Sequence, residues 1–319
     1  MRSIIITGGC GFIGYHLAKK LSYNENINIY LIDNFFRGKK DKSIKELLKK
    51  KNIFVIKHDL KKPFKKKIKN IEFIYHLAAI VGVSKVISNS YDVLVDNIKI
   101  LENILNFASL QKNLKKFIFL STSEVYGSSL DAGILKFPTK ETSIISTFNP
   151  PNKRSSYMLS KIYGEAMCKH SKINSIIIRP HNIYGPRMGF SHVIPELIKK
   201  MESNRKEVEI FNPTHKRCFC FIDDAVNYLE LLIRVKIKED FLILNLGNNN
   251  EEISILDLSK KLNLYYRKKL NFKKLDIGSP KRRLPCLKKI INLTKYNPKI
   301  NLDDGIKKTI NWYRFEKKY

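Results

Sequence analysis

The sequence predicts an α/β fold in which a doubly wound parallel sheet carries a smaller C-terminal lobe. Two observations predict this class. Short apolar runs alternate with amphipathic helical stretches through the first 180 residues, a pattern typical of parallel strands joined by right-handed crossovers. A glycine-rich segment, Thr7–Gly14 with the sequence TGGCGFIG, directly follows the first apolar run, where such a sheet turns from strand into helix.

The strand candidates of the first 180 residues are short, continuous apolar runs, as expected where both faces of a sheet are buried. In chain order they are Ile4–Thr7, Ile29–Asp33, Phe54–Lys57, Phe73–Leu77, Phe117–Ser121 and Ser175–Arg179. Helical periodicity lies between them, most clearly over Phe12–Lys20, Asp92–Leu110 and Tyr157–Ser171.

After Pro180 the predicted elements become short, and Pro, Gly and charged residues become frequent. We therefore expect residues 1–180 to form the sheet domain and residues 181–319 to form mostly the smaller lobe. Strand-like runs near 217–222 and 241–247 are expected to return to the sheet. Because no low-complexity linker separates the two parts, we expect them to pack closely together.

The chain of 319 residues carries a net charge of +31, which suits either a polyanionic partner or a composition rich in lysine. The lysines are scattered along the chain, and no basic stripe interleaved with aromatic residues accompanies the denser runs. We therefore attribute the charge to overall composition, which is also rich in Ile and Asn, and we expect no nucleic-acid partner.

Membrane and disulfide-linked classes are disfavoured by the sequence. No apolar run reaches the length of about 20 residues that spans a bilayer, and the chain opens directly into a strand rather than a signal peptide. The five cysteines are odd in number, and their spacings match no zinc site. The sequence therefore predicts a reduced, cytoplasmic protein with neither a membrane span nor a metal centre.

The glycine segment has the pattern of a dinucleotide-binding loop. Gly8, Gly11 and Gly14 allow a tight turn and a close approach of a pyrophosphate to the backbone. The helix that begins with Phe12 and Ile13 offers that phosphate free N–H groups and a positive dipole end. The segment therefore predicts a nucleotide cofactor at the end of the first strand.

Acidic residues at the ends of the next two strands extend this site. Asp33 lies about 20 residues after the loop, where a carboxylate accepts both adenosine ribose hydroxyls and repels a 2′-phosphate, which favours NAD over NADP. Arg37 argues in the opposite direction, because an arginine could serve a 2′-phosphate. Asp59 and Leu60 end the third strand, where they either border the adenine or form a solvated turn.

Tyr157 and Lys161 form the second strong motif, because residues at i and i+4 share one helix face. A lysine beside a phenol lowers the pKa of the phenol, so that Tyr157 becomes a usable base near neutral pH. The segment Ser121–Gly127, with the sequence STSEVYG, adds hydroxyl groups and a carboxylate at the end of another strand. Together these residues predict proton-transfer chemistry next to the cofactor.

The motifs together resemble the extended short-chain dehydrogenases/reductases, specifically their nucleotide-sugar epimerase, dehydratase and decarboxylase group. The resemblance covers nearly the whole chain, because motifs of the group occur in order as far as residue 283. It implies an NAD-binding Rossmann domain over residues 1–180 and a lobe over most of 181–319 that binds a nucleotide-diphosphate sugar. It also implies a homodimer formed through the helices Asp92–Leu110 and Tyr157–Ser171.

The resemblance also implies a role for individual residues. Thr122 matches the residue that holds the sugar O4, Tyr157 the base that takes the O4 proton, and Lys161 the lysine that orients the ribose. Further cofactor contacts are implied for Gly8, Gly11, Phe12, Ile13, Gly14, Asp33, Asn34, Asp59, Leu60, Leu77, Ala78, Ala79, Asn97, Ser121, Pro180 and His181. Substrate contacts are implied for Ser123, Asn182, His192, Val193, Arg217 and Arg282, whereas Arg187, Arg283 and also His192 could be ordinary residues of the lobe.

Three reactions diverge after oxidation of the sugar at C4, namely epimerisation, dehydration and decarboxylation. Glu124 beside Thr122 is more than a simple epimerase needs, so it joins the catalytic candidates. Thr-Ser-Glu at 122–124 and the Arg217 strand are similar to UDP-glucuronate decarboxylases, but GDP-mannose dehydratases share Thr-Ser-Glu. We therefore expect an NAD-dependent nucleotide-sugar epimerase or dehydratase, with a decarboxylase as the alternative. A non-catalytic NAD-binding regulator is the alternative from another class.

Overall fold

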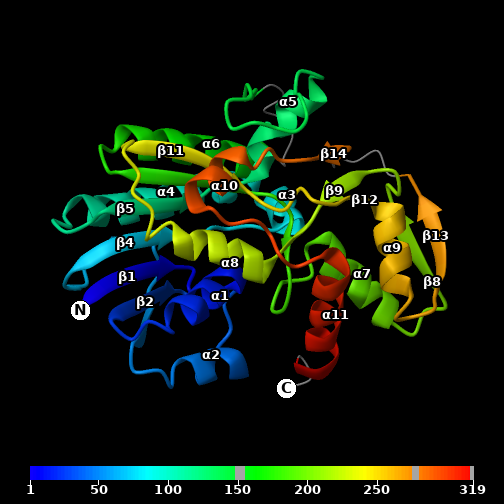
Figure 1. Ribbon diagram of the computed structural model, residues 1–319, viewed down its shortest axis with the longest axis horizontal. Helices are drawn as coiled ribbons and strands as arrows, with labels where there is room; N and C mark the ends of the chain where they lie inside the picture. Colours follow the sequence, from blue (N-terminus) through cyan, green and yellow to red (C-terminus); the bar gives the residue numbers. More distant parts are fainter. Residues whose placement is uncertain (148–154, 275–279, 317–319) are drawn as a thin grey trace.

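The computed structural model describes residues 1–147, 155–274 and 280–316, and its centre is a seven-stranded sheet (Figure 1). The strand order is β11-β6-β5-β4-β1-β2-β3, and all neighbouring pairs are parallel. Its strands are β1 (Arg2–Thr7), β2 (Ile27–Asp33), β3 (Ile53–Lys57), β4 (Ile71–His76), β5 (Lys116–Leu120), β6 (Ser175–Pro180) and β11 (Phe241–Leu246). The predicted α/β class is therefore confirmed.

Helices cover both faces of the sheet, so alternate residues of each strand are buried on opposite sides. In β1, Ile4 and Ile6 enter one apolar core, whereas Ile5 enters the other. The first core also contains residues of α1 (Phe12–Leu21) and α8 (Ile222–Leu231), and the second contains residues of α4 (Ser90–Ser109) and α6 (Ser155–His170) (Figure 1). The sheet is thus doubly wound.

Short helices follow three strands at the carboxyl edge of the sheet and carry much of the site described below. They are α2 (Lys42–Leu47) after β2, α3 (Val83–Ser88) after β4, and η1 (Ser123–Tyr126) with α5 (Gly127–Asp131) after β5. Asp41 caps α2, and Thr122 caps η1, each by accepting a hydrogen bond from a backbone N–H of the first turn.

The smaller lobe is built from the remaining elements, which pack beside the carboxyl edge of the sheet (Figure 1). It contains β7 (Ile183–Tyr184), α7 (Val193–Glu202), β8 (Glu207–Phe211), β9 (Lys216–Cys218), β10 (Cys220–Phe221), β12 (Glu252–Ser254), α9 (Ile255–Asn263), β13 (Lys269–Lys273), β14 (Arg282–Arg283), α11 (Leu302–Asn311) and η2 (Trp312–Glu316). α10 (Lys288–Thr294) contacts β11 and α8 instead. Residues beyond 180 therefore contribute to both parts of the molecule.

The two later strands predicted for the sheet have different positions. β11 is its edge strand, paired in parallel with β6. The segment near 217–222 does not join this sheet, because β9 pairs with β12 and β14, and β10 pairs with β7. After Pro180, which ends β6, His181 N–H still donates to the Leu246 carbonyl oxygen of β11, and the following strand β7 pairs with β10 in the lobe.

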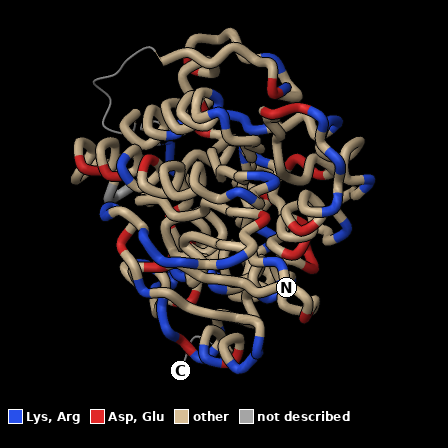
Figure 2. The backbone as a smooth tube through the Cα atoms, turned by 90° about the vertical axis from the view of Figure 1, so that its left-hand side faces the viewer, with Lys and Arg blue, Asp and Glu red and all other residues tan. Residues whose placement is uncertain are grey.

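Basic residues are spread over many elements. In Figure 2, Lys and Arg occur in helices and loops all around the tube, interspersed with Asp and Glu. Many acidic side chains are paired with them, for example in the exposed pairs between Lys269 and Glu207 and between Lys273 and Glu209 on β13 and β8. Over the described ranges, no helix has both the length and the apolar character needed to cross a membrane.

Candidate active site

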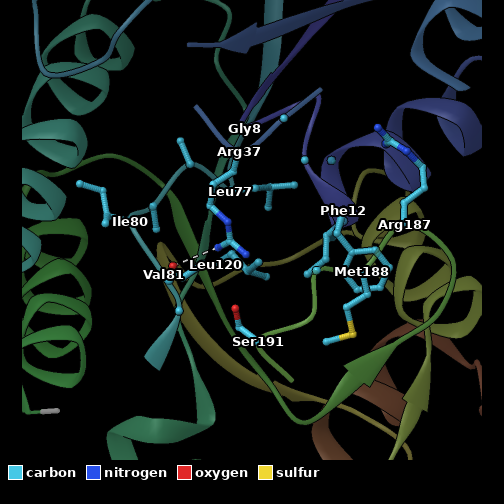
Figure 3. Close-up of a pocket in the computed structure, with 18 of the residues that line it drawn as sticks. Gly8, Phe12, Arg37, Leu77, Ile80, Val81, Leu120, Arg187, Met188 and Ser191 are labelled. Atoms are coloured by element: carbon cyan, nitrogen blue, oxygen red, sulfur yellow. Dashed lines mark hydrogen bonds between the residues drawn. The ribbon is translucent and has the colours of Figure 1, made fainter. Parts of the chain in front are cut away.

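A cavity of about 1280 Å³ opens between the sheet and the smaller lobe. Its walls come from segments that follow β1, β2, β4, β5 and β6 and from lobe residues 187–195. Figure 3 shows Gly8, Leu77 and Leu120 on the sheet side of this space and Met188 and Ser191 on the lobe side. The carboxyl edge of an open α/β sheet is where ligands of this class of fold bind.

The glycine loop is fixed by its own close packing. Gly8 has φ +65°, and a Cβ there would lie 3.0 Å from backbone atoms of Ala78. A Cβ on Gly14 would overlap the Gly8 carbonyl oxygen and lie 2.7 Å from Gly9 Cα. Gly11 is the N-cap of α1 and forms no side-chain cap, which suits a phosphate at this helix terminus.

Asp33, at the end of β2, lines the cavity beside this loop. Its carboxylate accepts hydrogen bonds from the backbone N–H of Cys10 at 3.0 Å and of Phe35 at 2.8 Å. Burial raises the pKa of Asp33, whereas these two bonds and the charge of Arg187 lower it. A buried carboxylate next to a helix N-terminus matches the ribose and the pyrophosphate of a dinucleotide, so the residues present fit NAD.

Most of the residues that the sequence assigns to the cofactor or the substrate lie in the wall of this cavity. On the cofactor side they are Gly8, Gly11, Phe12, Ile13, Gly14, Asp33, Asn34, Asp59, Leu60, Leu77, Ala78, Ala79, Ser121, Lys161 and Pro180. Thr122, Ser123, Glu124, Tyr157, Asn182, His192 and Val193 line the sugar side. The structure therefore brings together segments as far apart in the chain as Gly8 and Val193.

Asn97 and His181 are among the predicted cofactor residues but do not line the cavity. Asn97 on α4 accepts from Ile80 N–H at 2.7 Å and donates to the Ile80 carbonyl oxygen at 3.1 Å, so it positions a loop that does line the cavity. His181 is buried, with Nε2 at 3.3 Å from Asn245 Oδ1. Burial lowers the pKa of His181 to about 3, so the ring is neutral.

Arg37 crosses the cavity rather than remaining beside Asp33. Its Nη1 donates to the Val81 carbonyl oxygen at 3.3 Å, the interaction drawn in Figure 3. Its Nη2 would lie 3.6 Å from a Cβ built on Gly189, across the cavity in the lobe. The charge of Arg37 also lowers the pKa of Tyr157. This arginine therefore acts on the catalytic end of the site, whereas its position in the sequence suggests a 2′-phosphate contact.

Tyr157 and Thr122 are hydrogen-bonded partners at the sugar end. Thr122 is held in place because its Oγ1 accepts from Glu124 N–H at 3.2 Å as the cap of η1. Burial raises the pKa of the Tyr157 phenol and the Glu124 carboxylate raises it further, whereas Arg37 and the Thr122 bond lower it. In this arrangement the phenol holds its proton at neutral pH.

Lys161 lines the cavity but is not among the groups that shift the pKa of Tyr157. Its Nζ donates to the Leu120 carbonyl oxygen at 2.7 Å and lies 4.6 Å from the Phe119 ring centre but 5.9 Å from the Tyr157 ring centre. Burial lowers the pKa of Lys161 to about 8. Arg37 is thus the cation that lowers the pKa of Tyr157 here, and Lys161 ties α6 to the end of β5.

A buried ion pair lies directly behind these residues. The Arg179 guanidinium on β6 donates from Nε to Glu165 Oε1 at 2.9 Å and from Nη2 to Oε2 at 2.5 Å. Glu165 lies one helical turn after Lys161 on α6 and also accepts from Ser121 Oγ at 2.5 Å. A paired, fully hydrogen-bonded charge is what burial requires, so this network fixes the helix that carries Tyr157.

Arg283 also reaches the sugar end, and the sequence leaves its role open between a ligand contact and an ordinary lobe residue. Arg283 lines the cavity and lies 3.6 Å from Glu124 Oε1 through its Nη2. Neither Arg217 nor Arg282 lines the cavity. Arg217 is buried and donates to the Lys216 and Pro280 carbonyl oxygens, and Arg282 forms an ion pair with Glu252 at 2.7 Å. Neighbouring residues of a strand point to opposite sides, which separates Arg282 from Arg283.

Known proteins with similar sequences include nucleotide-sugar enzymes. The model of the NAD-dependent epimerase/dehydratase family matches residues 4–247. UDP-N-acetyl-alpha-D-glucosaminuronate decarboxylase of Bacillus cytotoxicus is 29% identical over 324 residues, which cover 97% of each chain. UDP-glucuronic acid decarboxylase 6 of Arabidopsis thaliana is 29% identical over 312 residues, which cover 95% of this chain and 86% of that protein.

A solved structure has a similar fold. UDP-glucuronic acid 4-epimerase from Bacillus cereus, crystallised with UDP-glucuronic acid and NAD, superposes with a TM-score of 0.81 and is 28% identical. The alignment covers 99% of this chain and 100% of that one.

Proposed function

Since this chain belongs to the NAD-dependent epimerase/dehydratase family, we propose that it acts on a nucleotide-activated uronic acid and removes its C6 carboxyl group after oxidation at C4. NAD dependence and nucleotide-sugar chemistry follow from the family and its relatives. The finer assignment is supported by the relatives named above, each of which has a uronic acid derivative in its name.

We assign the proton transfer at O4 to Tyr157 and Thr122, which are hydrogen-bonded to each other. Tyr157 would take the O4 proton, and Thr122, its hydrogen-bond partner, would hold the same oxygen. When bound, NAD supplies a hydride acceptor for C4 and returns the hydride at the end of the reaction. Because burial and Glu124 raise the pKa of Tyr157, the phenol needs a nearby positive charge to act as a base, and Arg37 contributes one in this arrangement.

The ion pair between Glu124 and Arg283 is the observation that carries the decarboxylase assignment. A ketone at C4 makes the C6 carboxylate a β-keto acid, in which the C5–C6 bond breaks, carbon dioxide leaves and the electron pair moves to O4. We expect Arg283 to leave Glu124 and hold that carboxylate, and we expect Glu124 to take up a proton from solvent and pass it to C5. A neutral sugar would give Arg283 no anion to bind.

A 4-epimerase acting on the same class of acid is the second candidate. Its specific support is the Bacillus cereus structure, whose chain acts as a UDP-glucuronic acid 4-epimerase. An epimerase must keep the carboxylate while the 4-keto ring turns over, whereas a decarboxylase must align the C5–C6 bond for cleavage. The two candidates therefore share every residue of the oxidation step and differ only around Glu124 and Arg283.

Product mass separates these possibilities. The purified protein is incubated with UDP-glucuronic acid, UDP-N-acetylglucosaminuronic acid and the matched neutral sugars UDP-glucose and UDP-N-acetylglucosamine, and products are followed by mass spectrometry and NMR. Loss of carbon dioxide from one of the acids is the expected result. An acid converted to its C4 epimer at unchanged mass would establish the second candidate, and loss of water from a neutral sugar would overturn both.

We also propose that the protein is a homodimer formed through α4 and α6. These helices pack against each other and expose Tyr91 and Val95 on α4 and Tyr163 on α6, with 76%, 40% and 56% of each residue accessible. Apolar groups gathered on two adjacent helices are typical of a surface that another protein covers. Light scattering should give twice the chain mass, and Tyr163→Glu should shift it toward the monomer.

A reducing, cytoplasmic location is the remaining proposal. All five cysteines are buried as free thiols, and no disulfide links them. Across the described segments, no group of His, Cys, Asp and Glu side chains is arranged to hold a metal ion. Thiol titration of the denatured protein, prepared without reductant, should therefore find all five groups reactive.

A further inference from the structure

Asn245 uses its whole side-chain amide for hydrogen bonds within the protein. It lies in β11, the edge strand of the sheet, and it is fully buried. Its Oδ1 accepts from the Tyr126 hydroxyl at 3.0 Å and lies 3.3 Å from His181 Nε2. Its Nδ2 donates to the carbonyl oxygens of Thr139 at 2.9 Å and of Cys286 at 3.4 Å. Because a carbonyl oxygen can only accept, these two bonds fix the orientation of the amide.

On one side, Asn245 is connected to the segment that carries Thr122 and Glu124. Tyr126 is the last residue of η1, the short helix that Thr122 caps and that contains Glu124. The Tyr126 hydroxyl donates to Asn245 and accepts from Arg179 Nη1 at 2.7 Å. Arg179 belongs to the buried ion pair that lies behind the site. The end of η1 is therefore fixed against both β6 and β11.

On the other side, Asn245 holds the segment that continues from Arg283. Directly after β14, Thr139 N–H donates to the Leu284 carbonyl oxygen and Cys286 N–H donates to the Thr139 carbonyl oxygen, both at 2.8 Å. Asn245 Nδ2 donates to Thr139 and to Cys286, so it binds both chains of this short pairing. β14 itself pairs with β9 of the lobe. Arg283 therefore lies between a lobe strand and an anchor on the edge of the sheet.

The two connections lead from Asn245 to the two members of the ion pair at the sugar end. Glu124 Oε1 and Arg283 Nη2 lie 3.6 Å apart in the cavity wall, whereas Asn245 does not line the cavity. The distance between these two side chains depends on how η1 is placed against β14. We propose that Asn245 is a positioning residue, which sets the place of Arg283 relative to Glu124 and so supports the step after C4 oxidation without touching the substrate.

This inference rests on the proposed function, which assigns Glu124 and Arg283 to the step after C4 oxidation. The oxidation itself should not need Asn245. The helix that carries Tyr157 is fixed by the ion pair between Arg179 and Glu165, which contains no atom of Asn245. Loss of the Asn245 amide should therefore slow the later step while C4 is still oxidised, and a loss of stability alone would not produce this pattern.

Two variants break the connection at different points. Asn245→Leu keeps a side chain of similar size and removes all four contacts, whereas Tyr126→Phe removes only the hydroxyl that joins η1 to Asn245. Asn52→Leu is the matched control, because Asn52 is also a buried amide and donates to three main-chain carbonyl groups. Asn52 directly precedes β3, at the edge of the sheet opposite the cavity. Chemical denaturation should show that both leucine variants are folded but less stable than the parent protein.

Each full-length variant is assayed with UDP-glucuronic acid or UDP-N-acetylglucosaminuronic acid, whichever the parent protein converts. Steady-state rates are combined with the absorbance of reduced nicotinamide during a single turnover at saturating sugar. Asn245→Leu should lower kcat by about tenfold, as expected when a reacting group is misplaced, and reduced nicotinamide should accumulate. Tyr126→Phe should give the same pattern more weakly, and Asn52→Leu should give neither effect.

A double-variant cycle tests whether Asn245 acts through Arg283. In an Arg283→Gln background, Asn245→Leu should change kcat/KM by less than about twofold, because the group that it positions is absent. Equal losses in both backgrounds, or equal losses in Asn245→Leu and Asn52→Leu, would overturn the inference. If Asn245→Leu does not fold, Tyr126→Phe in the same two backgrounds decides. A parent protein that converts only neutral sugars would refute the proposed function, and the cycle measured with that sugar would still show whether Asn245 and Arg283 are coupled.

Discussion

The two ends of the cavity are built in different ways. At the adenosine end, the glycine loop and Asp33 come from one continuous stretch of about 30 residues, and backbone geometry does most of the work. At the sugar end, Thr122, Tyr157 and Arg283 come from the N-cap of η1, from α6 and from β14, and they act through their side chains. The adenosine end is therefore readable as a local motif, whereas the sugar end exists only once the lobe has packed on the sheet.

The largest effect should come from Tyr157→Phe at the sugar end. Loss of the phenolic oxygen removes the base, so turnover should fall by a factor of about 10²–10⁴ while bound NAD is retained. Steady-state kinetics and the nucleotide content of the purified variant test this directly. A variant with normal turnover would remove Tyr157 from the mechanism, and a variant without NAD would mean that the two ends are not independent.

At the sugar end, Arg283 and Arg282 provide a matched pair of variants, one as the test and one as the control. Arg283→Gln should lower kcat/KM for a nucleotide uronic acid by about a hundredfold, because a charged hydrogen bond to the carboxylate is lost. Arg282→Gln should change it little, because Arg282 pairs with Glu252 outside the cavity. If both variants were equally impaired, the carboxylate site would not be at Arg283.

These two arginines also show where sequence reasoning fails. The fold, the glycine loop, Asp33 and the Tyr157 helix could be predicted, because each depends on local periodicity or on a contiguous motif. Arg283 could not, since β14 has only two residues, too few to show which of them faces the cavity. The direction of Arg37 depends on Val81 and Gly189, which no local pattern connects to it.

Tertiary packing also keeps Asn97 and Arg217 out of the cavity wall. Both were expected to contact cofactor or substrate, and each binds a main-chain carbonyl group, of Ile80 and Lys216 respectively. Lys161 lines the cavity, so its expected contact with the ribose stays a prediction. A motif specifies which residue type is present, but the tertiary packing decides what that residue contacts.

Gly14→Ala tests whether the adenosine end depends on backbone packing. A Cβ there would collide with the Gly8 carbonyl oxygen, and we expect the unfolding free energy to fall by about 1–3 kcal/mol together with weaker NAD binding. Gly127→Ala is the control, because no atom lies within 4 Å of a Cβ at that helical position. Chemical denaturation should show Gly127→Ala at least as stable as the parent protein; a stable Gly14→Ala with normal NAD affinity would contradict the packing argument.

The smallest effect concerns Lys161, which lies where the two ends meet. Burial lowers its pKa to about 8 in the folded protein, whereas the unfolded chain keeps the ordinary value of 10.5. Below pH 8 both states hold the proton and the cost of burying the charge is constant. Between these two values the unfolded state binds more protons, so stability should rise with pH.

Comparing the parent protein with Lys161→Met isolates the free-energy cost of burying the Lys161 charge. The variant has no charge to bury, so its advantage in unfolding free energy should shrink by about 1 kcal/mol or more as the pH rises from 8 toward 10.5. Lys169→Met, on the exposed side of the same helix, controls for the loss of a lysine. A difference that stays constant with pH would mean that Lys161 is solvated in the folded state, and that the Leu120 carbonyl contact does not hold it inside the wall between cofactor and sugar.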